Sequence, residues 1–109
     1  MKQYEVWWAE LPEPVGRRPV LLLSRTPAVA YLAKLIVAEV TTTRREIPQE
    51  ILLGVREGLA RPCVANLDNL HVVPKATLAE RAGRLAPSRE VEVKRALGAA
   101  LAWSELTTL

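Results

Sequence analysis

Residues 5–24 read EVWWAELPEPVGRRPVLLLS, and this stretch predicts how the fold begins. Residues 4–11 are rich in aromatic side chains around a β-branched valine, which is typical of a strand. Pro12 and Pro14 end that strand, and a short Pro-Val-Gly loop follows. Residues 20–23 form a continuous apolar run, as in a strand that is buried on both faces. The stretch therefore predicts two strands joined by a short loop.

The chain beyond this stretch predicts more short strands. Residues 35–42 are rich in Val, Ile and Thr, which favours a third strand. Residues 46–53 predict a fourth, and Pro48 places it at an edge or a bulge because proline cannot donate to a β-ladder. After a loop at 54–62, residues 63–67 and 71–73 predict two further strands.

The C-terminal part predicts two helices. Thr77 and Glu80 have the spacing of a capping box, and Gly83 would end that short helix. After Pro87, apolar residues at helical spacing predict a longer amphipathic helix whose buried arc holds Val93, Ala96, Leu97, Ala100 and Trp103. Strands followed by helices in this order predict a mainly β protein, a small barrel or sandwich with a C-terminal helical lid.

Length and composition exclude several classes of protein. The chain has 109 residues, 50% of them hydrophobic and 25% charged, which predicts one folded domain over residues 1–109. No apolar run approaches the roughly 20 residues of a membrane span, and the N-terminus does not resemble a signal peptide, so we expect a cytoplasmic protein. One cysteine and one histidine cannot build a disulfide framework or a His/Cys zinc site. Cys63 is expected to be buried and inert.

The basic charge is concentrated in the middle of the chain. The net charge is +3, but residues 17–45 hold six bases against a single acid, Glu39. Such a stretch favours an anionic partner such as nucleic acid, and a solvated surface with a basic bias is the alternative. The sequence has no glycine-rich phosphate loop and no HExxH, GxSxG or CxxC motif, and His71 is its only imidazole.

Four stretches together resemble the MazF/PemK (Kid) family of toxin endoribonucleases. Residues 5–24 are similar to the family's opening, in which a Pro-containing loop precedes R-P-V-L-V. Three further stretches agree in order and spacing: IVAEVT at 36–41, CVANLDNLHVVPKATL at 63–78 and RLAPSREVEVKRALGAAL at 84–101. The resemblance covers residues 4–103.

The resemblance implies a fold and a function. The fold would be an SH3-like barrel of the CcdB/Kid/MazF type, with a short helix and a C-terminal α-helix, forming a homodimer. The function would be that of the toxin of a type II toxin–antitoxin system, a sequence-specific endoribonuclease that cleaves single-stranded RNA without metal or other cofactor. The substrate's 2′-hydroxyl would attack the phosphate, giving a 2′,3′-cyclic phosphate and a 5′-hydroxyl. A cognate antitoxin would be the protein partner, and no membrane would be involved.

The resemblance also assigns candidate catalytic residues. Arg18 precedes Pro19 as the family's catalytic arginine precedes its proline, and Thr41 occupies the family's Thr/Ser position. A guanidinium suits the negative charge that builds on the phosphorane, so Arg18 would stabilise that charge and protonate the leaving group, while Thr41 would orient the phosphate. His71 replaces a family arginine and is the candidate base for the 2′-hydroxyl, a structural histidine being the alternative.

Other positions are candidates for RNA binding or depart from the family pattern. Trp7 and Trp8 point to opposite faces of one strand, so one fills the core, and Trp8 is the candidate for stacking on a base or for a dimer interface. The remaining RNA-binding candidates are Arg17, Arg44, Arg45 and Asn69. Where the family has a glutamine this sequence has Asn69, where it has an aspartate this sequence has Pro74, and its later arginine is Thr77 here. These departures leave two alternatives open: a degenerate, non-cutting family member, or a CcdB-like gyrase poison that uses Trp103.

Overall fold

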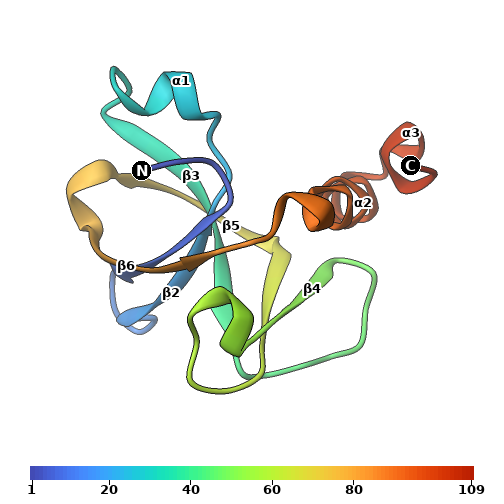
Figure 1. Cartoon of the computed structure of the whole chain (residues 1–109), viewed down its shortest axis with the longest axis horizontal. Helices are drawn as coiled ribbons and strands as arrows, with labels where there is room; N and C mark the ends of the chain where they lie inside the picture. Colours follow the sequence, from blue (N-terminus) through green and yellow to red (C-terminus); the bar gives the residue numbers. More distant parts are fainter.

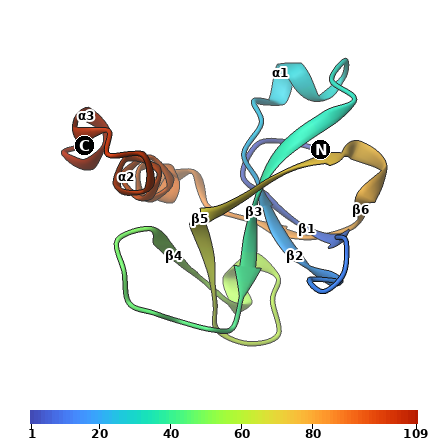
Figure 2. The ribbon, with the colours of Figure 1, turned by 180° about the vertical axis from the view of Figure 1, so that it is seen from behind.

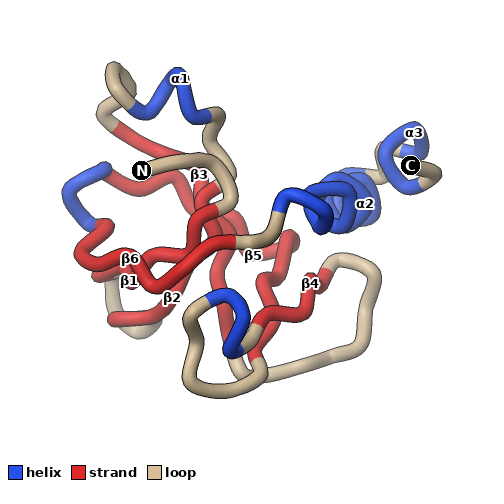
Figure 3. The backbone as a smooth tube through the Cα atoms, viewed as in Figure 1, coloured by secondary structure: helices blue, strands red, loops and turns tan.

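The framework of the protein is one six-stranded antiparallel sheet, seen in a computed structural model that describes residues 1–109. The strands are β1 (Glu5–Glu10), β2 (Arg17–Leu22), β3 (Lys34–Thr41), β4 (Glu50–Leu53), β5 (Cys63–Pro74) and β6 (Leu78–Arg84). Their order in the sheet is β4-β5-β3-β2-β1-β6, and the sheet curls strongly between its two free edges, β4 and β6 (Figures 1 and 3). The predicted mainly β fold is therefore confirmed, as an open half-barrel.

Short helices fill the connections, and one longer helix ends the fold. The helices are α1 (Thr26–Val29), the 3₁₀ helices η1 (Val55–Glu57), η2 (Lys75–Thr77) and η3 (Pro87–Arg89), then α2 (Glu90–Leu101) and α3 (Ser104–Thr107). Seen from behind, α2 and α3 stand on the side of β4 and β5, away from α1 (Figure 2). No helix has both the length and the apolar character needed to cross a membrane.

The sheet buries a separate apolar cluster on each of its faces. On β2, Leu21 contributes to the larger cluster, whereas Val20 and Leu22 contribute to the smaller one, because successive side chains of a strand face opposite sides. Helix α2 covers the larger cluster with Val93 and Ala96, so the predicted amphipathic helix is confirmed over its central turns. The continuous apolar run in β2 is thus buried on both faces, as its composition predicts.

Strands β4 and β5 differ from their predicted boundaries. Strand β4 is shorter than predicted but lies at an edge, and Pro48 falls outside its ladder. The two strands predicted at 63–67 and 71–73 are one long strand, β5. Ala38 pairs with Leu70 and the next residue, Glu39, pairs with Asn66, so a bulge at 67–69 bends β5 without ending it.

The short helix predicted from Thr77 to Gly83 is wrong, because this segment is the strand β6. The Thr77 hydroxyl donates to the carbonyl oxygen of Pro74 at 2.7 Å and closes a 3₁₀ turn instead of capping a helix. Leu78 then enters the smaller core cluster, and the strand pairs with β1. Tertiary pairing with an otherwise free edge outweighs the local capping pattern.

The prediction that Trp103 lies on the buried arc of the C-terminal helix is also wrong. Helix α2 ends at Leu101, Ala102 adopts a left-handed conformation, and Trp103 lies in the turn before α3. Its side chain is 50% exposed. The amide of Trp103 donates to the carbonyl oxygen of Gly98 at 2.8 Å, which closes the helix before the apolar pattern ends.

Gly58, at the end of η1, and Gly83 of β6 let these two segments pack backbone against backbone, and this contact gives a stability prediction. A Cβ at Gly83 would lie 2.3 Å from the carbonyl oxygen of Glu57, whereas a Cβ at Gly54 would meet nothing within 4 Å. We expect Gly83→Ala to lower the free energy of unfolding by about 1–3 kcal/mol, the usual cost of overpacking. Gly54→Ala, whose backbone is extended, is the matched control and should change it little. Thermal or urea unfolding checks both variants, and equal stability of the two would contradict the packing account.

Glu5 gives a second prediction, for stability at low pH. Burial alone would raise the pKa of this carboxyl, but hydrogen bonds from Trp7, the Lys2 amide and Arg81 lower it below its ordinary value of 4.5. A lowered pKa stabilises the fold above about pH 4.5, and this stabilisation is lost as the pH falls through the folded-state pKa. As the pH is lowered, the free energy of unfolding of the wild type should therefore fall more steeply than that of Glu5→Gln. Identical acid profiles for the two proteins would refute this role of Glu5.

Candidate active site

A largely buried carboxylate, that of Glu39, joins two of the predicted catalytic residues. Arg18 on β2 donates from Nη1 to Oε1 of Glu39 on β3. Nε2 of His71 on β5 lies 3.0 Å from the other oxygen, Oε2, of the same carboxylate. The Glu39 side chain is 14% exposed, and those of Arg18 and His71 are each 30% exposed. Glu39 therefore lies between an arginine and a histidine, with both of its oxygens in use.

The strand pairing explains why these side chains meet. Val20 of β2 pairs with Glu39, which brings Arg18 alongside the same stretch of β3. On the other side Val37 pairs with His71, two residues before Glu39 on the same face of β3. Glu39 lies on the same face of the sheet as the buried Val20 and Val37. Its carboxylate is therefore at the rim of the smaller core cluster, to which both valines belong.

Arg18 and Thr41 line a groove of about 370 Å³. One wall is apolar and includes Trp8, and the polar groups are two arginines and two threonines. The lining residues are Trp8, Arg18, Pro19, Val40, Thr41, Thr42, Leu59, Ala60, Arg61 and Cys63. The groove combines an aromatic ring with a guanidinium and hydroxyl groups, which suits a nucleobase attached to a phosphate.

A second, wholly polar hollow of about 250 Å³ shares Arg18 and Thr41 with the groove. Its other lining residues are Glu39, Thr43, Arg45, Asn66 and Asn69. The Thr41 hydroxyl accepts a hydrogen bond from the Thr43 amide at 3.2 Å. Arg18 and Thr41 thus stand between the two hollows, with Arg45 and Asn69 next to them.

The remaining predicted residues line neither of these two hollows. Arg17 lies over the Trp8 ring, 5.2 Å from its centroid, and pairs with the exposed Glu10 at 2.9 Å. Arg44 pairs with Glu46 at 3.7 Å and lines neither hollow. His71 contacts Glu39 but lines a different hollow, of about 440 Å³, together with residues of the β1–β2 loop. Trp7 packs against the smaller core cluster, as expected for the partner of Trp8 that faces inward.

Sequence reasoning missed Glu39, Leu59 and Arg61. Glu39 is the only acid among residues 17–45, and this isolation in a basic stretch was the available signal. Leu59 and Arg61 follow η1 in a segment without a recognisable motif, and only the folded chain brings them to the groove. Burial raises the pKa of the Cys63 thiol, so at neutral pH this residue is a neutral apolar lining and not a nucleophile.

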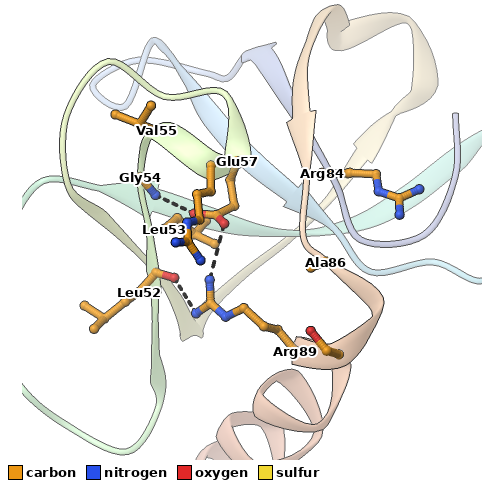
Figure 4. Close-up of a pocket in the computed structure, with 10 residues that line it drawn as sticks. Leu52, Leu53, Gly54, Val55, Glu57, Arg84, Ala86 and Arg89 are labelled. Atoms are coloured by element: carbon orange, nitrogen blue, oxygen red, sulfur yellow. Dashed lines mark hydrogen bonds and ion pairs between the residues drawn. The ribbon is translucent and has the colours of Figure 1, made fainter.

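The largest hollow of the protein, about 720 Å³, is separate from these residues (Figure 4). Arg89 crosses it, donating to the Leu52 carbonyl oxygen at 2.7 Å and contacting the Glu57 carboxylate at 3.4 Å. These bonds tie the start of α2 to β4 and η1, which is a structural role. No group of three or more His, Cys, Asp or Glu side chains gathers where it could hold a metal ion.

Comparisons with known proteins agree with this geometry. The family described as PemK-like, MazF-like toxin of type II toxin-antitoxin system matches residues 2–101. Among curated relatives, probable endoribonuclease MazF5 of Mycobacterium tuberculosis is 41% identical over 98 residues, which cover 89% of each chain. Probable endoribonuclease MazF2 of the same species is 36% identical over 100 residues, covering 91% of this chain and 96% of the relative.

Solved structures show the same fold. The Mycobacterium tuberculosis toxin MazF-mt6 superposes with a TM-score of 0.85 at 32% identity, covering 90% of this chain and 96% of the toxin. A mycobacterial endoribonuclease in complex with its cognate antitoxin superposes with a TM-score of 0.81 at 25% identity, covering 94% of this chain and 96% of that one. The chain belongs to the PemK-like, MazF-like toxins of type II toxin–antitoxin systems.

Proposed function

We propose that this toxin is an endoribonuclease that cleaves single-stranded RNA at short sequences without a metal ion. The observation that carries the proposal is the groove in which the Arg18 guanidinium and the Thr41 hydroxyl lie beside Trp8. A relative that is 41% identical is named probable endoribonuclease MazF5, and others are named endoribonuclease MazF, which supports the same activity here. An RNA substrate would place its action in the cytoplasm.

The proposed reaction is an in-line displacement at phosphorus. The 2′-oxygen forms a bond to phosphorus as the bond to the 5′-oxygen breaks, leaving a 2′,3′-cyclic phosphate and a 5′-hydroxyl. Arg18 stabilises the charge on the phosphoryl oxygens and supplies the proton to the leaving oxygen, and Thr41 orients the phosphate. His71 is the base that takes the proton of the 2′-hydroxyl. Its place on the far side of Glu39 puts the base and Arg18 on opposite sides of one carboxylate.

The neighbouring side chains give the RNA a path across this site. A base can stack on Trp8, whose ring is already held by Arg17. Arg45 and Asn69, in the polar hollow, would contact the adjoining nucleotide, and Arg44 would contact phosphate outside both hollows. The gyrase-poison alternative has no comparable support, because the family match and the named relatives are MazF toxins.

An antitoxin and a second copy of the chain are the proposed protein partners. A relative of known structure was solved in complex with its cognate antitoxin, and an antitoxin segment that covers the groove would block RNA from Arg18. The side chains of Ile36, Leu70 and Val72, on one face of β3 and β5, are 44%, 39% and 64% exposed. An exposed apolar row on a sheet face fits the interface of a homodimer.

Cleavage of RNA tests the proposed activity. In the presence of EDTA, the purified protein should cut a long single-stranded RNA at discrete sites and leave 5′-hydroxyl ends. Arg18→Ala should lower the rate by on the order of 100-fold or more, because a positioned donor to the developing charge is lost. The variant should still bind the antitoxin. Intact RNA with folded, antitoxin-free wild type would instead support the degenerate, non-cutting alternative.

The dimer surface has a separate test by sedimentation. Val72→Lys places a charge in the exposed apolar row and should convert the dimer to a monomer. Val55→Lys is the matched control, because Val55 is 78% exposed on η1, outside this row. A wild-type monomer, or a Val72→Lys variant that remains a dimer, would contradict the assignment.

A further inference from the structure

We propose that Glu39 is a positioning residue for cleavage, one that fixes the direction of the Arg18 guanidinium and the proton-accepting nitrogen of His71. The inference rests on the proposed function and deepens it. No other residue contacts both Arg18 and His71 through side-chain hydrogen bonds. The role follows from three features: the burial of the carboxylate, the bonding of Arg18, and the identity of the His71 nitrogen that faces it.

Burial makes the Glu39 contacts strong and directional. A carboxylate that is 14% exposed has few water molecules to replace a lost partner, so its two oxygens are satisfied by Arg18 and His71. Thr41, two residues further along the same face of β3, lies at the same rim. The position of the carboxylate is therefore fixed by the central strand of the sheet.

Arg18 depends on Glu39 for its orientation. Its Nε atom is buried without a hydrogen-bond partner, so the guanidinium is anchored through Nη1 alone. An arginine side chain with several rotatable bonds loses a defined direction when its single anchor is removed. Arg18 also lines the groove and the polar hollow, in each case together with Thr41. Glu39 thus presets the group that would meet the phosphate.

His71 depends on Glu39 for its tautomer. An ionised carboxylate only accepts hydrogen bonds, so the Nε2 atom that lies 3.0 Å from Glu39 carries the hydrogen. In the neutral imidazole the proton is then absent from Nδ1, which becomes the nitrogen that can accept the proton of the 2′-hydroxyl. The imidazolium formed in that step is stabilised by the carboxylate that it already contacts.

Glu5 provides a matched control for loss of a buried carboxylate. Its side chain is 12% exposed, and it accepts hydrogen bonds from Arg81 at 2.9 Å and from Trp7 at 3.0 Å. It lines a hollow that contains neither Arg18 nor Thr41. Glu5→Gln and Glu39→Gln therefore remove similar arginine–carboxylate pairs. The first pair is remote from Arg18 and Thr41, and the second includes Arg18 and lines the polar hollow beside the groove.

The kinetic test compares these two variants on a cleavable RNA and on an analogue with a 2′-deoxy nucleotide at the scissile position. We expect Glu39→Gln to lower kcat by about 10-fold or more while Kd for the analogue stays within about 3-fold, since positioning acts on the chemical step. Glu5→Gln should lose about as much thermal stability as Glu39→Gln does, but its kcat should stay at the wild-type value. An unchanged kcat in Glu39→Gln, or an equal fall in both variants, would overturn the inference.

Nitrogen NMR of the single histidine tests the tautomer without any cleavage. At about pH 8.5, where an ordinary imidazole is neutral, wild-type His71 should be in the Nε2–H form, and Glu39→Gln should convert it to a mixture. A wild type in the Nδ1–H form would overturn the inference even if the toxin cuts RNA. A wild type that is in the Nε2–H form but cuts no RNA would overturn the proposed function and leave the Glu39–His71 pairing established.

Discussion

The pairing of β3 with both β2 and β5 is the constraint on which the core and the site depend. Alternation along β3 sends Ala38 and Val40 into the larger apolar cluster and Val37 into the smaller one. The same alternation places Glu39 and Thr41 at the rim of the smaller cluster. A shift of one residue in this register would move the valines to the wrong face and separate Arg18 from the carboxylate, so core packing holds the proposed catalytic geometry in place.

Much of this fold is predictable from local composition, and the wrong prediction for residues 77–83 has a long-range cause. The apolar run in β2 and the Val/Ile/Thr-rich β3 are strands because they are buried on both sides of a sheet, and their composition shows it. Thr77 and Glu80 have a helical pattern, but the free edge of β1 pairs with this segment. The pairing of β6 with the distant strand β1 therefore determines its structure, and such a contact cannot be predicted from the local sequence pattern.

The site was predictable to the extent that a family resemblance could locate single residues. Arg18 and Thr41 stand next to the same groove, as the resemblance implies. Glu39 was missed because its proposed role depends on two partners that are 21 and 32 residues away in sequence. The contact of His71 was likewise not predictable, because the position of a histidine in the sequence does not show which of its ring nitrogens faces a carboxylate.

In the proposed mechanism, the 2′-hydroxyl of the substrate is the nucleophile that attacks the phosphate beside Arg18. The most direct measurement replaces the nucleotide on the 5′ side of one mapped cleavage site with its 2′-deoxy form and leaves every other site as RNA. The account predicts that cleavage stops at the substituted site alone, while the other sites are cut and end in a 2′,3′-cyclic phosphate. Continued cleavage at the substituted site would show that another nucleophile attacks the phosphate and would contradict the account.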